Sequence, residues 1–299
     1  METFFQQLIN GLSLGAIYAL IALGYTMVYG VLRLINFAHG DVYMLGAFAG
    51  YYIANALSLD ANPSIPGAIF VTLGAMAVCA GIGIVIERLA YRPVRHHSRL
   101  TSLITAIGVS LLLEYGGQVV FGATPRFFPQ MIRSEVYAIG GVQITNQSLL
   151  IIVVAVVVMF GLEFIVHRTK IGKAMRATSY NLTVAKLMGI NTDFVIAFTF
   201  ALGSALAAAG GVMVALAIPR IDPLMGLMTG LKAFVAAVLG GIGNIPGAMI
   251  GGVLIGLMET WIGATSYSTY RDAVAFAVLI LILLLRPAGI MGSSVTEKV

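Results

Sequence analysis

Residues 149–161 read LLIIVVAVVVMFG, an unbroken apolar run, and the segment continues to Val166 with Glu163 as its one charged residue. A membrane β-barrel would show alternating apolar and polar residues, and this run does not alternate. Similar runs recur along the chain, and a helix needs about 20 apolar residues to cross the hydrocarbon core of a bilayer. The pattern predicts an all-α fold, a polytopic transmembrane helical bundle.

The composition agrees with a membrane protein. The chain has 299 residues, of which 59% are hydrophobic and only 10% charged, whereas a soluble domain carries about 25% charged residues. The net charge of +5 is best interpreted by position, because Lys and Arg in short loops mark the cytosolic side. It therefore does not require a nucleic-acid partner.

The first apolar run and Cys79 bear on signal-peptide cleavage and on disulfide or metal chemistry, respectively. The first apolar run has no basic residue before it, so we expect a retained helix and not a cleaved signal peptide. Cys79 is the only cysteine, which excludes an internal disulfide and a cysteine metal cluster and predicts a packed thiol.

Nine apolar segments are candidates for membrane crossings. The seventh and eighth are separated by GGIGNIPG at residues 240–247, whose glycines and proline free backbone groups that lipid cannot satisfy. The pair is therefore either two spans or one broken or re-entrant element, which gives eight or nine membrane segments. Nine crossings would put the N-terminus outside and the C-terminus inside. The expected segments are residues 8–29, 42–57, 69–86, 100–121, 149–166, 194–218, 225–243, 248–262 and 273–285.

Two basic loops define the orientation. Residues 87–99 contain four arginines, and residues 167–193 read HRTKIGKAMRATSYNLTVAKLMGINTD. With the predicted spans, both loops fall on the cytosolic side, and the polar interval 122–147 faces the exterior. In the second loop, an unbroken helix would place Lys173, Arg176 and Tyr180 on one stripe. Gly189 suits the end of that helix, and residues 191–193 would cap the next one. The loop is either a docking surface or a linker held by anionic head groups.

Polar residues at membrane depth are candidates for a solute path. Asn36, His39 and Tyr43 follow the helical spacing i, i+3, i+7, which would place them on one face as a gate or path lining. Alternatively, they belong to a polar loop in which Asn36 or Asp41 caps the next helix.

The remaining membrane-depth charges have two interpretations each. Lys232 either pairs with an acid such as Glu259 or Asp41 or extends to an interface, and it is our fourth path candidate. We expect Glu163 and Glu114 to reach the head groups.

Gly243, Gly247 and Gly251 recur every four residues, a spacing typical of close helix packing. An ion or solute site built from unwound backbone is the alternative.

Motifs of enzyme chemistry are missing from the sequence. Gly172-Lys173 is followed by Ala174 and lacks the earlier glycine of a GxxxxGK[ST] phosphate-binding loop. There is also no cysteine or histidine pattern for zinc and no serine in a GxSxG turn. We therefore expect no enzyme activity, cofactor or metal in this chain.

Four motifs in order resemble a known family. They are NFAHGDVYM at 36–44, ERLAYRP at 87–93, MGIN at 188–191 and AAVLGGIGNIPGA at 236–248. They are similar to the LivH-type permease subunits of bacterial branched-chain amino-acid ABC importers. The resemblance implies one permease domain over residues 1–299 in the bacterial inner membrane, translocating Leu, Ile and Val. It further implies a periplasmic binding protein, a paralogous second permease and two cytosolic ATPases that hydrolyse the ATP.

The resemblance also identifies residues 167–193 as a coupling segment that enters an ATPase cleft. The general pattern has Glu-Ala-Ala, three residues and Gly; here only Ala185 and Gly189 match, with Thr183 and Val184 in place of Glu and Ala. The coupling candidates are Lys173, Arg176, Ala185 and Gly189. Two alternative functions stay open: a permease for urea, amides or another small solute, and a proton-coupled secondary transporter that uses His39 and Asp41.

Overall fold

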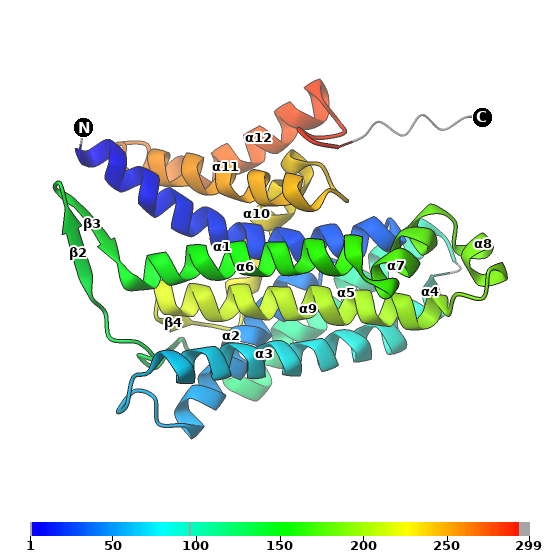
Figure 1. The fold of residues 1–299 in the computed structure, drawn as a ribbon, viewed down its shortest axis with the longest axis horizontal. Helices are drawn as coiled ribbons and strands as arrows, with labels where there is room; N and C mark the ends of the chain where they lie inside the picture. Colours follow the sequence, from blue (N-terminus) through cyan, green and yellow to red (C-terminus); the bar gives the residue numbers. More distant parts are fainter. Residues whose placement is uncertain (1, 96, 293–299) are drawn as a thin grey trace.

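The computed structural model describes residues 2–95 and 97–292, and within them it is almost entirely helical. Seven runs of helix are long and apolar enough to cross a membrane. Their helices lie side by side along the long axis of the molecule (Figure 1), which confirms the predicted helical bundle. These helices are α1 Glu2–Leu32, α3 Ile65–Ile86, α5 Arg99–Phe121, α6 Asn146–Arg168, α9 Thr192–Ala217, α11 Ile245–Gly263 and α12 Arg271–Leu285, the last of which reaches 18 residues together with the short turn at Ser268–Tyr270 before it.

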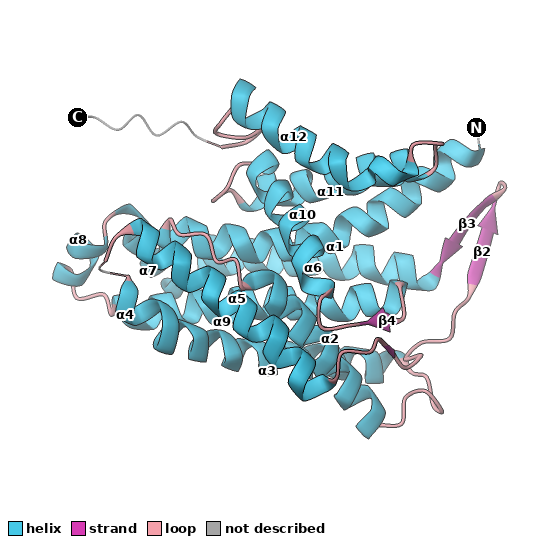
Figure 2. Cartoon of the chain, turned by 180° about the vertical axis from the view of Figure 1, so that it is seen from behind, coloured by secondary structure: helices cyan, strands magenta, loops and turns pink. Residues whose placement is uncertain are grey.

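Two further helices, α2 (His39–Ala56) and α10 (Met225–Gly240), complete the set of nine expected segments. Neither is among the seven long apolar runs; α10 has only 16 residues. Figures 1 and 2 both show α10 rising steeply across the direction of the long helices. The segment at 225–262 is therefore two helices joined by a turn, one of them crossing the bundle.

Short elements occur at the two ends of the bundle. A two-stranded hairpin, β2 (Val136–Ile139) with β3 (Val142–Thr145), lies in the polar interval before α6. Its turn consists of Gly140 and Gly141, both with positive φ, as a two-residue hairpin turn requires. The other short elements are η1 Glu87–Tyr91, α4 Arg92–Val94, α7 Lys170–Tyr180, α8 Leu182–Leu187, η2 Ser268–Tyr270 and the antiparallel pair β1 Arg126–Phe127 with β4 Arg220–Ile221.

The two basic loops meet at one end of the bundle, which we call the basic end. Arg92 Nη2 lies 2.9 Å from Asp193 Oδ2, and Arg95 also pairs with Asp193. The β2–β3 hairpin is at the opposite end, where the Gln6 side chain bonds both the N–H and the C=O of Gln143. The predicted common side of the two basic loops is confirmed.

The last described residues return to the basic end. Ile290 N–H donates to Leu239 O at 2.9 Å, and Met291 N–H donates to Gly240 O at 3.0 Å, next to the turn between α10 and α11. The start of α1 therefore lies at the opposite end from the segment after α12. This is the arrangement predicted for nine crossings.

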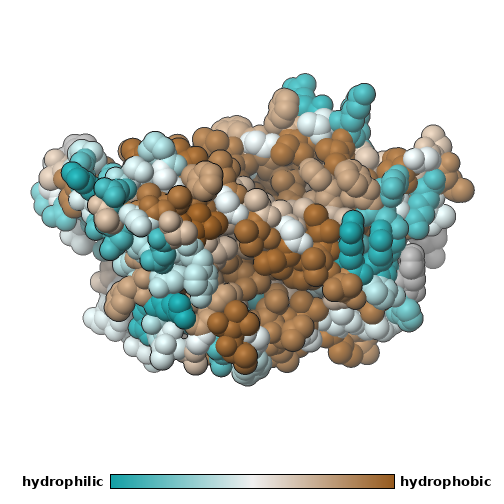
Figure 3. All heavy atoms as spheres, turned by 90° about the horizontal axis from the view of Figure 1, so that it is seen from below, coloured by the Kyte–Doolittle hydropathy of each residue, from teal (hydrophilic) through white to brown (hydrophobic). Residues whose placement is uncertain are grey.

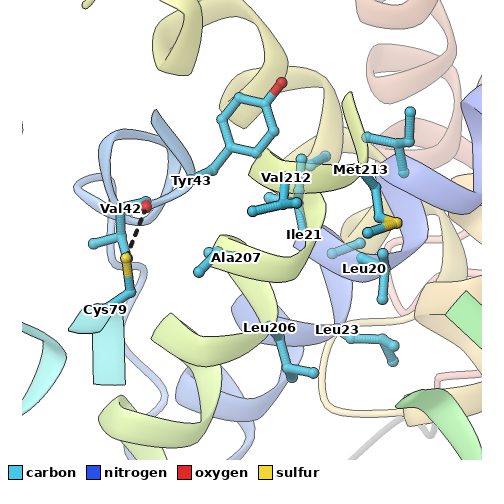
Figure 4. Close-up of a cluster of buried hydrophobic side chains, with 14 of the residues drawn as sticks. Leu20, Ile21, Leu23, Val42, Tyr43, Cys79, Leu206, Ala207, Val212 and Met213 are labelled. Carbon is cyan, nitrogen blue, oxygen red and sulfur yellow. Dashed lines mark hydrogen bonds between the residues drawn. The ribbon is translucent and has the colours of Figure 1, made fainter. Parts of the chain in front are cut away.

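Small residues bring the central helices close together. A Cβ on Gly252 would collide with the Ala19 backbone of α1, and one on Gly256 would collide with Gly15. Larger apolar side chains from α1, α2 and α9 fill the adjoining core (Figure 4). The predicted packed thiol is confirmed, because Cys79 is buried with its Sγ 3.8 Å from Val42 O.

The glycine series 243, 247, 251 divides into two roles. Gly247 and Gly251 lie on α11, where an added Cβ would meet Gly240 or Ala236 of α10, as predicted for close packing. Gly243 instead lies in the turn before α11, with φ +93°, and an added Cβ would meet only Gly30 Cα, at 3.9 Å. Its assignment to helix packing is therefore wrong; this residue is needed for backbone conformation.

These two roles predict different costs for the same substitution. Gly243→Ala should lower the free energy of unfolding by about 1–2 kcal/mol, the strain of a Cβ at positive φ. Gly251→Ala should cost more, up to about 3 kcal/mol, because its Cβ would lie 2.8 Å from Gly240 N and even closer to Ala236 O. Thermal unfolding in detergent measures both. A smaller loss for Gly251→Ala than for Gly243→Ala would contradict this packing.

A broad apolar band separates two hydrophilic ends of the surface (Figure 3). Large apolar side chains on the outer helices point away from the core, as lipid-facing residues do. Examples are Phe70, Leu112, Val119, Phe164 and Leu285. The long axis of the bundle is therefore the direction that crosses the membrane.

Candidate functional site

A compact arm, residues 169–191, projects from the basic end between α6 and α9 (Figure 1). Its first helix, α7, begins at Thr169, whose Oγ1 accepts a hydrogen bond from Gly172 N–H at 3.1 Å. A Cβ on Gly172 would collide with the carbonyl oxygens of Ile165 and Val166, so α7 lies directly against the end of α6. Met175 is buried on the inner face. The base of the arm is thus held firmly on the bundle.

The arm is not the single helix that the stripe pattern assumed. Asn181 adopts an extended conformation between α7 and α8, and its Oδ1 accepts from Thr183 N–H and Val184 N–H, both at 3.0 Å. Such an N-cap starts a new helix in a new direction. Lys173 and Arg176 remain on the exposed face of α7.

The end of α8 has the predicted glycine geometry. Gly189 has φ +81°, its N–H donates to Lys186 O, and Ile190 N–H donates to Ala185 O, both at 3.0 Å. This left-handed turn ends the helix. Gly189 is exposed, but Ala185 is only 3% exposed. Ala185 therefore packs inward and does not offer its side chain to a partner.

Four large side chains at the outer end of the arm are exposed, although they are apolar or aromatic. Tyr180 is 90% exposed, Leu187 81%, Met188 78% and Val184 51%. Clustered apolar residues on a polar surface are typical of an interaction site. We call these residues the apolar tip. Sequence reasoning named none of them as contacts, although three apolar residues in a polar loop were a usable signal.

The start of α9, which directly follows the arm, is joined by ion pairs to the segment after α3. Asn191 Oδ1 caps α9 by accepting from Phe194 N–H at 3.1 Å, as predicted. Asp193, two residues on, binds Arg92 and Arg95 beside the end of α3. Arg95 also lies 3.9 Å from the fully buried Glu87. A displacement of α8 would therefore be passed directly to α9 and α3.

The residues predicted to line a path do not share one helical face. Asn36 precedes α2 in a non-helical segment, where its Oδ1 accepts from Tyr91 O–H at 2.7 Å. His39 and Tyr43 lie one turn apart on α2, both buried, and His39 Nε2 is 3.1 Å from Ile21 O. The prediction of one shared helical face is wrong because α2 begins at His39 and Asn36 lies outside the helix.

The capping alternative for this segment is also wrong. The N-cap position of α2 is Ala38, with no side-chain hydrogen bond. Asp41 accepts instead from Ser110 O–H on α5 at 2.5 Å. Glu114, also on α5, is buried and so does not reach the head groups in this structure.

Lys232 belongs to a half-buried charge cluster among α1, α10, α11 and α12, in which Lys232 and Glu259 are the buried members. Its Nζ lies 2.9 Å from Glu259 Oε1 and 2.6 Å from Asp272 Oδ1. Arg271 is 3.2 Å from the same Glu259 oxygen, and Tyr18 O–H donates to the other at 2.6 Å. Of the partners considered for Lys232, the structure selects Glu259 and not Asp41. Throughout residues 2–95 and 97–292, no group of three or more His, Cys, Asp or Glu could hold a metal ion.

Fold and site together define a multi-pass membrane protein with an apolar-tipped arm, followed directly by a membrane helix whose start is held by ion pairs. The chain belongs to the family described as the branched-chain amino acid transport system / permease component, which matches residues 7–283. It is therefore a transport permease subunit and a multi-pass protein of the inner membrane.

Named relatives cover almost the whole chain. The high-affinity branched-chain amino acid transport system permease protein BraD of Pseudomonas aeruginosa is 42% identical over 99% of this chain and 98% of its own. The corresponding proteins called LivH of Escherichia coli and Salmonella typhimurium are 44% and 43% identical over the same shares. The resemblance drawn from the four sequence motifs is confirmed.

Proposed function

We propose that this chain is one half of the translocation unit of an ABC importer that carries Leu, Ile and Val into the cell. The names of its relatives support this solute class, and the family description supports the role of permease component. In this proposal residues 1–299 act as one permease domain. ATP hydrolysis occurs in two separate cytosolic ATPase subunits, a paralogous second permease completes the path, and a periplasmic binding protein delivers the solute.

The observation that carries the mechanism is the apolar tip on a firmly anchored arm. In the proposal, the tip inserts into a cleft of the ATPase, with Lys173 and Arg176 beside it and Gly189 at the turn. Closure of the ATPases moves the arm, and the ion pairs of Asp193 with Arg92 and Arg95 pass that movement to α9 and α3. The membrane helices then switch between two arrangements whose balance depends on the nucleotide bound.

Asn36, His39, Tyr43 and Lys232 remain candidates for the path. All four are buried within this chain. In the proposal these residues support the wall of the path, and His39 holds α2 to α1. Their positions change when the helices change arrangement.

Reconstitution tests this function. The chain is purified with its candidate ATPases, second permease and binding protein and placed in proteoliposomes with ATP inside. We expect uptake of labelled leucine that requires every component, with urea and acetamide taken up poorly. Uptake of urea in preference to leucine would overturn the assignment of branched-chain amino acids as the transported solutes. Uptake that persists without the ATPases and collapses with an uncoupler would indicate a secondary transporter.

A further inference from the structure

A cavity of about 320 Å³ lies at the basic end, among α1, α6, α7 and the turn between α10 and α11. Its volume is in the range of pockets that hold small molecules, about 300–1,000 Å³. Its walls combine polar and apolar side chains in nearly equal measure. The lining includes Thr26, Met27, Val31, Glu163, Arg176 and Ile245.

Two polar atoms in this lining have no hydrogen-bond partner within the described residues. Thr26 is 1% exposed, and its Oγ1 is unpaired. Three buried threonines in other helices bond a backbone carbonyl instead; Thr199, for example, donates to Val195 O at 2.8 Å. Glu163 Oε1 lies 2.9 Å from His167 Nδ1, but the buried Oε2 is also unpaired. Since buried polar atoms are nearly always bonded, two unpaired ones in one cavity call for a hydrogen-bonding occupant, either water or a ligand.

The charges define the chemistry of that ligand. The carboxylate of Glu163 needs a hydrogen-bond donor and favours a cation, and the guanidinium of Arg176 favours a carboxylate. Arg176 uses one nitrogen to donate to Val166 O, which holds the guanidinium at the wall of the cavity. Met27, Val31 and Ile245 contribute apolar surface to the same cavity. An aliphatic α-amino acid has an ammonium, a carboxylate and an apolar side chain that match these three features.

We propose that this cavity binds an aliphatic α-amino acid from the cytosolic side. The solute class rests on the proposed function, but the site is separate from the candidates for the translocation path. The ammonium binds Glu163 Oε2, the carboxylate binds Arg176, and the Thr26 hydroxyl completes the set.

The position of the cavity gives the bound amino acid a regulatory effect. Its walls come from both the arm and the bundle, so a ligand holds α7 against α1 and the turn before α11. A ligand that binds one arrangement of the arm better than another shifts the balance toward it. Solute accumulated in the cytosol therefore slows further uptake by restraining the arm.

The test uses the complete reconstituted assembly, with ATP and varied unlabelled leucine enclosed in the lumen. For the parent protein, lumenal leucine should lower the initial rate of uptake of external labelled leucine. Thr26→Val and Glu163→Gln should each raise the lumenal leucine needed for half-inhibition by about 10-fold, the loss of one hydrogen bond to a charged group. Their uptake with an empty lumen should match the parent. Thr199 is a buried threonine outside the cavity, so uptake by Thr199→Val should be inhibited by lumenal leucine as strongly as uptake by the parent.

Equilibrium binding of labelled leucine to the purified assembly without the binding protein provides a second measurement, which does not depend on transport. Saturable binding that both variants weaken supports the site even if leucine proves not to be the transported solute. No saturable binding, or equal binding and inhibition in parent and variants, overturns the proposal. A lipid that co-purifies with the parent and is lost from Glu163→Gln would also overturn it, by identifying a different occupant.

Discussion

Replacing Leu187 by Asp should abolish ATP-driven leucine uptake while leaving the permease folded. Leu187 is 81% exposed at the apolar tip, so the substitution removes no core contact. In an ATPase cleft, the same change would bury an unpaired charge in place of an apolar contact. Loss of a central interface residue costs about 2 kcal/mol or more, at least ~30-fold in affinity. Co-purification with the ATPase and uptake in proteoliposomes measure the effect.

The matched control is Val136→Asp, an exposed apolar position (55%) on the β2–β3 hairpin at the opposite end. It should assemble with the ATPase and take up leucine at the parental rate. If Leu187→Asp assembled and transported like this control, the apolar tip would not be the ATPase contact. Ala185→Ser should also be mild for assembly, because Ala185 faces the inside of the arm.

Replacing Lys232 by Met should cause the largest loss of stability among single substitutions in the charge cluster. The ammonium compensates both Glu259 and Asp272, of which Glu259 is buried. Removing one partner of a buried ion pair typically costs about 3–5 kcal/mol, because it leaves an uncompensated charge. We expect the lower end of this range, since Arg271 stays 3.2 Å from Glu259. Thermal unfolding of the purified protein measures the loss.

A double variant separates charge balance from packing. Lys232→Met with Glu259→Gln removes one positive and one negative charge and should recover at least half of the lost stability. As a control, Lys173→Met on the exposed face of α7 should change stability by less than about 0.5 kcal/mol. A Lys232→Met protein as stable as its parent would show that the cluster does not hold α10 to α11 and α12.

The sequence was sufficient for the features that depend on neighbouring residues. The apolar runs predicted all nine helices. They placed the start of α1 near residue 8, but the helix begins at Glu2, because the hydrogen bonds between Gln6 and the β2–β3 hairpin leave no trace in the hydropathy of the chain. Turn and cap residues such as Gly189 and Asn191 were recognisable because their chemistry is local. The positions of arginines and lysines were enough to place both basic loops on one side.

By itself, the sequence determined the membrane fold, the common side of the basic loops and the family, because apolar length, loop charge and ordered motifs are properties of the chain in one dimension. Only the tertiary structure decided that Lys232 pairs with Glu259, that Ala185 is buried while Leu187 is exposed, and that Gly243 belongs to a turn. It also brought Thr26 and Glu163 to one cavity. These outcomes depend on which helices lie together and how they are rotated, and no local pattern specifies contacts between residues so far apart in the chain.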